Sequence, residues 1–153
     1  MEKPIFVLNG PNLNRLGTRE PQIYGTTTLA EIEQMCRNAV GAHPLRFHQS
    51  NAEHEIIGWI NEAIDGGAGI IINAAAYTFT SLAILDALKM FQGPIIELHI
   101  SNIHRREVHY QNSFISKVAT GVIVGLGAGG YPLAVTAMLE FLRGGYGTNR
   151  HST

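Results

Sequence analysis

The sequence contains one cysteine, Cys36, little net charge and no long apolar run. A single cysteine excludes a disulfide framework within the chain and fits a reducing compartment. No stretch approaches the ~20 apolar residues of a membrane span, and the N-terminus lacks the pattern of a signal peptide. A net charge of −1 provides no long-range attraction to nucleic acid or to anionic membranes. We therefore expect a cytoplasmic protein that binds neither, with Cys36 as a partly buried structural thiol.

The composition that remains is that of a soluble domain with a real core. Apolar residues make up 45% of the 153 residues, and charged residues make up 15%. The length suits one domain, and neither a repeat nor an interdomain linker is evident. We expect a single catalytic domain over residues 1–143. The glycine-rich polar segment 144–153 is expected to be a flexible tail.

Short apolar runs alternate with amphipathic stretches along the chain. The runs predict strands at 4–8, 45–50, 69–74, 94–100 and 121–126. Three of these runs are apolar on both faces, which is typical of a parallel sheet covered on both sides. The stretches between them predict helices over 29–40, 54–64, 81–91 and 131–142. This alternation favours an α/β fold, and five strands favour the flavodoxin-like order 2-1-3-4-5.

Helix starts are marked by capping residues. Thr28 with Glu31 has the spacing of a capping box, and Ser50 with Glu53 repeats it. Thr80 or Ser81 is the expected N-cap of the next helix. Pro132 suits the first turn of the last helix.

The predicted fold also predicts where a ligand binds. Open parallel sheets bind ligands beyond the carboxyl ends of their strands, where the strand order reverses. Polar residues stand at these ends of the first, third and fourth strands: Asn9, Asn12, Asn73, Glu97, His99, Ser101 and Asn102. Their convergence predicts a small-molecule site.

Two pairs of residues in this region could transfer protons. Glu97 and His99 are two apart on a strand, so their side chains share a face, and a carboxylate beside an imidazole favours a proton donor near neutral pH. Arg19 and Tyr24 lie in the long polar connection 9–25. A tyrosine is a poor base at pH 7 unless a cation stabilises its phenolate, and arginine supplies such a cation. Each pair could instead be ordinary solvated residues at the protein surface.

Two further patterns resemble cofactor or metal sites. The segment "GLGAGG" at 125–130 fits the dinucleotide fingerprint, but it occurs in the last strand–helix unit, with no second half to follow. A close approach of a turn, with N–H groups in the pocket wall, is the better interpretation. His99, His104 and His109 have a spacing of five, which suits no usual zinc pattern. No cofactor and no metal are expected.

Four segments resemble motifs of the type II 3-dehydroquinate dehydratases. They read "NGPNLNRLGTREPQIYG", "INAAAYTFTS", "IELHISNIHRRE" and "ATGVIVGLGAGGYPLA". The match covers nearly the whole chain, in order and with the expected spacing. The resemblance implies a flavodoxin-like, cofactor-free, cytosolic enzyme that is typically dodecameric. It also implies anti elimination of water from 3-dehydroquinate to give 3-dehydroshikimate through an enolate.

The resemblance further implies roles in proton transfer. Tyr24 is implied as the base that removes a C2 proton, with Arg19 holding it as the phenolate. His99, oriented by Glu97, would protonate the departing C1 hydroxyl. Asn12 would help to stabilise the enolate through water.

Other positions are implied to bind the substrate. Asn73, together with the groups around Ile100 and Ser101, would bind the carboxylate and the tertiary hydroxyl. Arg106 would help to close a lid. Asp86 would reach the site of a neighbouring subunit.

Three positions depart from the pattern of the resembled family. Phe79 stands where a histidine is expected, Tyr110 where an arginine is expected, and Leu85 where arginine is frequent. Both of the first two positions are implied to bind the ring hydroxyls. Phe79 cannot donate a hydrogen bond, and Tyr110 offers one neutral hydroxyl in place of a forked cation. Losing two such contacts would weaken the use of dehydroquinate by roughly two to four orders of magnitude unless other groups compensate.

The sequence leaves three hypotheses. The first is a 3-dehydroquinate dehydratase, either a typical one or a divergent one of reduced efficiency. The second is a related lyase that acts on another 3-keto-carboxylate with a less hydroxylated or bulkier ring. The third is a flavodoxin-like binding protein whose catalytic residues are relics.

Overall fold

A five-stranded parallel sheet forms the centre of the molecule, in the order β2-β1-β3-β4-β5. The computed structural model describes residues 2–18 and 20–146. The strands are β1 (Ile5–Asn9), β2 (Leu45–Gln49), β3 (Gly69–Asn73), β4 (Ile95–His99) and β5 (Gly121–Val124). Every residue of β1, β3 and β4 is buried, as expected for central strands covered on both faces. The predicted strands and their order are confirmed.

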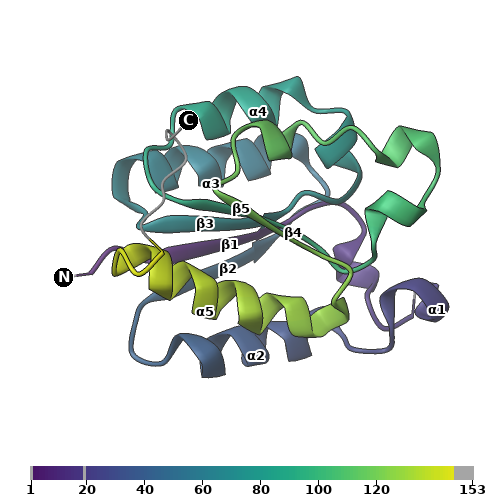
Figure 1. Ribbon diagram of the computed structural model, residues 1–153, viewed down its shortest axis with the longest axis horizontal. Coiled ribbons are helices and arrows are strands. Elements are labelled where there is room, and N and C mark those ends of the chain that lie inside the picture. The colour runs from purple at the N-terminus through teal and green to yellow at the C-terminus, as the bar shows by residue number, and fades with distance from the viewer. Residues whose placement is uncertain (1, 19, 147–153) are drawn as a thin grey trace.

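Helices cover both faces of this sheet (Figure 1). The long helices are α2 (Leu29–Val40), α3 (Glu53–Gly66), α4 (Leu82–Lys89) and α5 (Gly130–Leu142). α3 and α4 pack on one face of the sheet, and α2 and α5 pack on the other, which gives two separate apolar cores. A further helix of four residues, α1 (Pro21–Tyr24), was not predicted from the sequence. The flavodoxin-like three-layer fold is thus confirmed.

Most of the predicted helix caps are confirmed. The Thr28 side chain accepts a hydrogen bond from the Glu31 N–H, and the Glu31 carboxylate accepts one from the Thr28 N–H. Ser81 caps α4 by accepting from the Ile84 N–H. Pro132 lies in the first turn of α5.

The second predicted capping box, Ser50 with Glu53, is wrong. α3 begins after Ala52, which makes no side-chain cap. The Ser50 hydroxyl instead accepts from the Ala52 N–H at 2.9 Å and donates to Glu55. Serine therefore closes a turn before the helix, since it can bond to a nearby backbone N–H without being the N-cap.

Replacing Thr28 by alanine should destabilise the protein by about 0.5–2 kcal/mol, because it removes a complete capping box from a 12-residue helix. Urea unfolding followed by circular dichroism measures this loss. Thr26→Ala is the matched control, since Thr26 is an exposed threonine just before the cap. Equal losses in the two variants would contradict a specific role for the cap.

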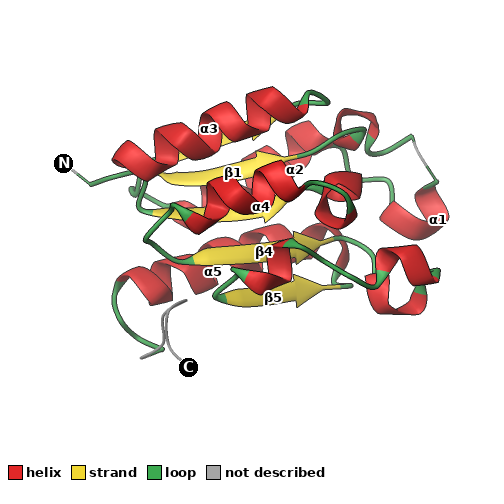
Figure 2. Ribbon diagram, turned by 90° about the horizontal axis from the view of Figure 1, so that it is seen from above, coloured by secondary structure: helices red, strands yellow, loops and turns green. Residues whose placement is uncertain are grey.

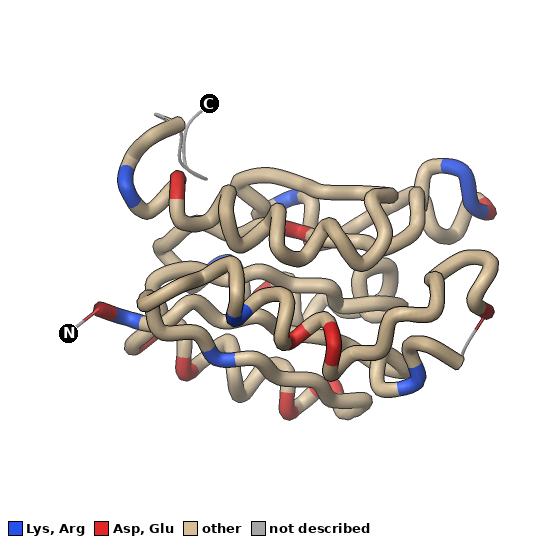
Figure 3. Tube along the Cα trace, turned by 90° about the horizontal axis from the view of Figure 1, so that it is seen from below, with Lys and Arg blue, Asp and Glu red and all other residues tan. Residues whose placement is uncertain are grey.

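Cys36 is a buried structural thiol, as the sequence predicts. The Cys36 side chain is fully buried in α2, more completely than expected, and burial raises the pKa of its thiol to about 12. Over the described residues, lysine and arginine are interspersed with aspartate and glutamate on the chain trace, and no large patch carries a single sign (Figure 3). Within residues 2–18 and 20–146, no helix is both long and apolar enough to cross a membrane.

The strand arrangement brings several connections to one end of the sheet. The segment after β1, which leads to α1, and the segment after β4 both extend from the carboxyl ends of the strands (Figure 2). The register places Asn9 of β1 opposite Asn73 of β3. Asn9 and Asn73 are 64 residues apart in the sequence, and they meet at this edge, where a ligand site is expected.

Candidate functional site

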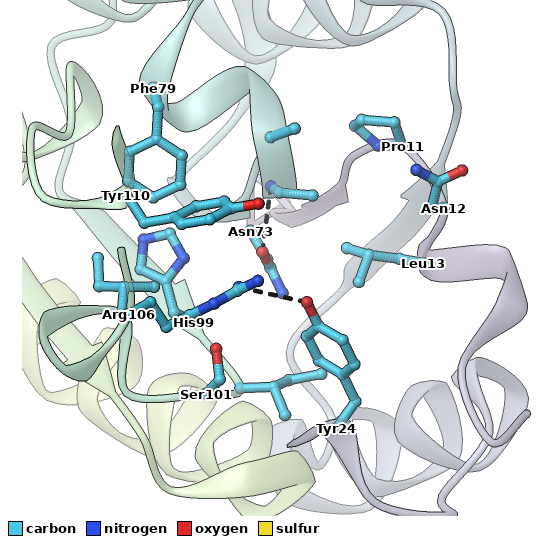
Figure 4. Close-up of a pocket in the computed structure, with 14 residues that line it drawn as sticks. Pro11, Asn12, Leu13, Tyr24, Asn73, Phe79, His99, Ser101, Arg106 and Tyr110 are labelled. Atoms are coloured by element: carbon cyan, nitrogen blue, oxygen red, sulfur yellow. Dashed lines mark hydrogen bonds between the residues drawn. The ribbon is translucent and has the colours of Figure 1, made fainter. Parts of the chain in front are cut away.

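A cavity lies at the carboxyl end of the sheet, between the segments after β1, β3 and β4. Its volume is about 80 Å³, several times the roughly 10–15 Å³ that one water needs on a comparable measure. Of the twelve residues to which the family resemblance assigns a role, nine line it (Figure 4): Asn12, Tyr24, Asn73, Phe79, His99, Ile100, Ser101, Arg106 and Tyr110. A small polar molecule can therefore contact residues from all three segments.

Glu97 and His99 form a buried hydrogen-bonded pair at the end of β4. The His99 Nε2 donates to Glu97 Oε2 at 2.6 Å, and the two side chains are only 5% and 1% exposed. Glu97 does not line the cavity but lies behind His99. This bond leaves Nδ1 as the ring nitrogen that can exchange a proton with a ligand.

Two serines complete the environment of Glu97. Ser113 donates to Oε2 at 2.6 Å, and Ser116 donates to Oε1. Burial would raise the pKa of the Glu97 carboxyl, but these bonds and the one from His99 outweigh it, so the pKa is lowered. The carboxylate is therefore held charged, which favours a fixed orientation of the imidazole. Sequence reasoning missed both serines, because they approach from a loop that carries no periodic signal.

Tyr24 faces the cavity from the opposite side. It is the last residue of α1, and its hydroxyl oxygen accepts a hydrogen bond from Arg106 Nη1 at 3.3 Å. Arg106 belongs to the segment after β4, so this bond joins two segments that are 82 residues apart. Arg19, which the sequence paired with Tyr24, lies outside the described residues.

Aromatic rings form one wall of the cavity. The Phe79 ring stacks on the His99 ring at 6.1 Å between centroids and meets the Tyr110 ring edge-on at 5.4 Å. The guanidinium carbon of Arg106 lies 4.0 Å from the centre of the Tyr110 ring. This wall offers a ligand flat apolar surface and only one neutral hydroxyl.

Asn73 connects the cavity to a buried polar network. Its Nδ2 donates to the Tyr131 hydroxyl at 3.0 Å, and that hydroxyl donates to Asn9 Oδ1 at 2.7 Å. Asn9 also donates to the backbone of β2 through the His48 carbonyl. Asn9 is fully buried and does not line the cavity, so its expected place in the site is wrong. It joins the strand ends below the cavity floor instead.

Two backbone distortions shape the rim of the cavity. Asn12 has a φ of 69° and Ala75 a φ of 51°, both in the left-handed region that non-glycine residues rarely adopt. Asn51 supports the first turn by accepting from the Asn12 N–H at 2.9 Å. Such strain commonly marks a functional site, since the surrounding structure must maintain it.

Three features suggested by the sequence lie away from the cavity. Asp86 is on the exposed side of α4, where it pairs with Lys89 at 3.9 Å. Asn102 caps a short 3-10 helix by accepting from the His104 N–H. The glycine turn 125–130 packs against the end of β4 but is absent from the described lining of the cavity.

The glycine turn does make the close approach that was expected. The Gly125 and Gly127 N–H groups donate to the carbonyls of His99 and Ile100. Gly125 has a φ of 83°, and a Cβ there would lie 3.0 Å from Asn102. The turn therefore holds the backbone of His99 and Ile100 in place. The expectation that its N–H groups form part of the pocket wall is wrong.

Taken together, the cavity has a tyrosine with a guanidinium beside it and, on the other side, an imidazole supported by a carboxylate. Such a pair can remove a proton from one carbon of a small ligand and donate a proton to a group leaving from its neighbour. Asn12, Asn73 and Ser101 supply hydrogen-bonding groups for orientation.

Comparisons with known proteins identify the family of the chain. The family model described as dehydroquinase class II matches residues 3–139. A protein of Bartonella bacilliformis named 3-dehydroquinate dehydratase is 51% identical, over 100% of this chain and 98% of its own. Another of Agrobacterium fabrum, named 3-dehydroquinate dehydratase 2, is 55% identical, over 88% of this chain and 92% of its own.

Solved structures agree with the sequence comparisons. The type II dehydroquinase from Propionibacterium acnes has a TM-score of 0.82 and 44% identity, covering 90% of this chain and 97% of its own. The type II dehydroquinase from Butyrivibrio crossotus has a TM-score of 0.86 and 40% identity, covering 90% and 98%. Fold and sequence thus agree over almost the full length, and the chain belongs to the class II dehydroquinase family.

Proposed function

We propose that this chain is a hydro-lyase that dehydrates 3-dehydroquinate to 3-dehydroshikimate by anti elimination. The observation that carries the proposal is the placement of Tyr24 and His99 on opposite sides of one cavity. A base on one side and an acid on the other suit removal of a proton and of a hydroxyl from opposite faces of a ring. Family membership and relatives named 3-dehydroquinate dehydratase support the same substrate.

The proposed reaction begins with proton removal. The Tyr24 phenolate takes a proton from C2, which is acidic because it adjoins the C3 ketone, and the electron pair moves to the carbonyl oxygen to give an enolate. Arg106 and, by resemblance, Arg19 favour the phenolate. Asn12 stabilises the enolate oxygen through water. Positioned bases of this kind contribute roughly 10²–10⁴ to a rate.

The second step expels water. The enolate reforms the ketone, the C1–C2 double bond forms, and the C1 hydroxyl leaves with a proton from His99. Glu97 holds the imidazole for this transfer. Every proton that moves has a side chain to carry it, so the reaction proposed here uses no cofactor.

Substrate binding is assigned to the remaining lining residues. Asn73, Ile100 and Ser101 are proposed to bind the carboxylate and the tertiary hydroxyl, and Arg106 to help close the cavity. The ring hydroxyls would face Phe79 and Tyr110. Because Phe79 offers no hydrogen bond, we expect weaker ground-state binding of a hydroxylated ring than a polar residue there would give.

The wider setting is also proposed. The exposure of Asp86 suits a residue that reaches the site of a neighbouring subunit in a homo-oligomer, and a dodecamer follows from the family resemblance. The single-domain unit 1–143 would be the catalytic protomer, located in the cytoplasm. Of the proposed tail 144–153, residues from 147 onward lie outside the described part of the chain.

An assay of the purified chain with 3-dehydroquinate tests the proposal. We expect growth of the near-ultraviolet absorbance of a conjugated enone, with the product verified by NMR. Substrate deuterated on one face at C2 should show that the proton and the hydroxyl leave from opposite faces. A ligand-induced thermal shift without turnover would contradict catalysis and favour a binding protein.

A further inference from the structure

We propose that Tyr110 is a positioning residue whose ring holds the Arg106 guanidinium beside the hydroxyl oxygen of Tyr24. This inference rests on the proposed function, in which Tyr24 is the base. It gives Tyr110 a task that does not depend on contact with the ligand. It also concerns a position at which this chain departs from the family pattern.

Three contacts carry the inference. The Arg106 guanidinium carbon lies 4.0 Å from the centre of the Tyr110 ring, within the range of a cation–π contact. The same guanidinium donates from Nη1 to the Tyr24 oxygen at 3.3 Å. Its distance from the Tyr24 ring centre is longer, at 6.0 Å. Arg106 therefore stacks on one tyrosine and hydrogen-bonds to the other (Figure 4).

The Tyr110 ring is itself held in place from two sides. The Phe79 ring makes a T-shaped contact with it at 5.4 Å between centroids, and the His109 ring packs against it at 4.4 Å between centroids. Phe79 stacks in turn on His99, whose orientation Glu97 fixes. An aromatic surface anchored to the rigid end of β4 therefore extends as far as Arg106.

The backbone near Arg106 is fixed independently of its side chain. Gln111 donates to the Ile103 carbonyl at 3.0 Å and to the Arg106 carbonyl at 2.8 Å. The loop is thus tied down, but the arginine side chain still has four rotatable bonds to order. Stacking on a planar ring restricts those bonds and leaves the N–H groups in the plane free to donate.

The charges around the cavity explain why the position of Arg106 matters. Its described titratable lining residues are Tyr24, His99, Arg106 and Tyr110, with Glu97 behind His99. No aspartate, glutamate or lysine is among these lining residues. The Arg106 cation therefore acts on Tyr24 without a competing carboxylate in the described wall, and displacing it by a few ångströms weakens its effect on the phenolate.

The variants Tyr110→Phe and Tyr110→Leu distinguish the contribution of the Tyr110 ring from that of its hydroxyl. The phenylalanine variant keeps the surface on which Arg106 stacks, whereas leucine removes it. Ionisation of Tyr24 is followed by the near-ultraviolet absorbance of tyrosinate, with each variant measured against the same protein carrying Tyr24→Phe. We expect Tyr110→Leu to make Tyr24 ionise at higher pH by a roughly three- to tenfold change in proton affinity. Tyr110→Phe should leave it unchanged.

A double-mutant cycle tests whether Tyr110 acts through Arg106. Arg106→Gln should shift the ionisation of Tyr24 at least as far as Tyr110→Leu does. Adding Tyr110→Leu to Arg106→Gln should cause no further shift, because the group being positioned is gone. Equal shifts in Tyr110→Phe and Tyr110→Leu, no shift in Tyr110→Leu, or additive shifts in the double variant would each overturn the proposal.

Because these readouts need no turnover, they remain valid if 3-dehydroquinate proves not to be the substrate. Thermal unfolding of each variant checks that the fold is retained. Where turnover is present, the acidic limb of kcat/KM should move with the spectroscopic titration in Tyr110→Leu. A fall in activity with the limb unmoved would assign Tyr110 to ligand binding and contradict the positioning role.

Discussion

Tyr24→Phe is expected to lower kcat on 3-dehydroquinate by about 10²–10⁴, with a much smaller change in KM. The variant removes one oxygen and keeps the ring that packs beside the cavity. That oxygen is the atom to which Arg106 donates at 3.3 Å. If it is the base, its loss removes a contribution made only in the transition state, so kcat should fall while ground-state binding is largely retained.

The control for Tyr24→Phe is Tyr146→Phe, which deletes the same hydroxyl from an exposed tyrosine after α5. Both variants should keep the unfolding midpoint of the parent within a few degrees, since Tyr24 is only partly buried. Steady-state kinetics and thermal unfolding measure the two effects. Activity that survives in Tyr24→Phe at the parental level would remove Tyr24 from the mechanism.

The sheet and its order could be predicted because the relevant signals are local. The runs in β1, β3 and β4 are apolar on both faces, and few arrangements other than a doubly covered parallel sheet bury such strands. The Thr28–Glu31 capping box was equally readable, since both partners lie within one helical turn. The place of the cavity then followed from topology alone.

Features that depend on contacts between distant segments could not be read in this way. The Tyr131–Asn9 bond spans 122 residues, and Tyr131 gave no pattern that distinguishes it from an ordinary core aromatic. At Ser50 a local pattern gave a wrong prediction. The spacing of a capping box was present, but the Ser50 hydroxyl closes a turn before the helix instead. Spacing predicts which bonds are possible, and packing decides which are made.

In the site, too, local contacts were predictable from the sequence and contacts between distant segments were not. Glu97 and His99 were predictable as a pair because alternate residues on a strand share a face. The bond between Arg106 and Tyr24 was not, since the sequence paired Tyr24 with the nearer arginine, Arg19. A guanidinium 82 positions away reaches the same oxygen, and only the folded chain brings the two together.

His99→Gln should lower kcat by about 10²–10⁴ because glutamine can still donate to Glu97 but cannot supply a proton to a leaving hydroxyl. Retaining a donor matters here, since Glu97 is a carboxylate only 1% exposed. Leaving such a charge without a partner costs several kcal/mol and would confuse a chemical effect with unfolding. Ser113 and Ser116 continue to solvate the carboxylate in the variant.

Exchange of the C2 proton with solvent provides a second measurement on His99→Gln. If His99 assists departure of the hydroxyl and Tyr24 removes the C2 proton, blocking only the departure leaves the first step intact. His99→Gln should then exchange the C2 proton of 3-dehydroquinate with solvent deuterium faster than it forms product, whereas Tyr24→Phe should do neither. His54→Gln, at an exposed histidine outside the cavity lining, is the matched control. Loss of exchange and turnover together in His99→Gln would mean that His99 acts before or during proton removal, and the acid and base assignments would have to be exchanged or merged.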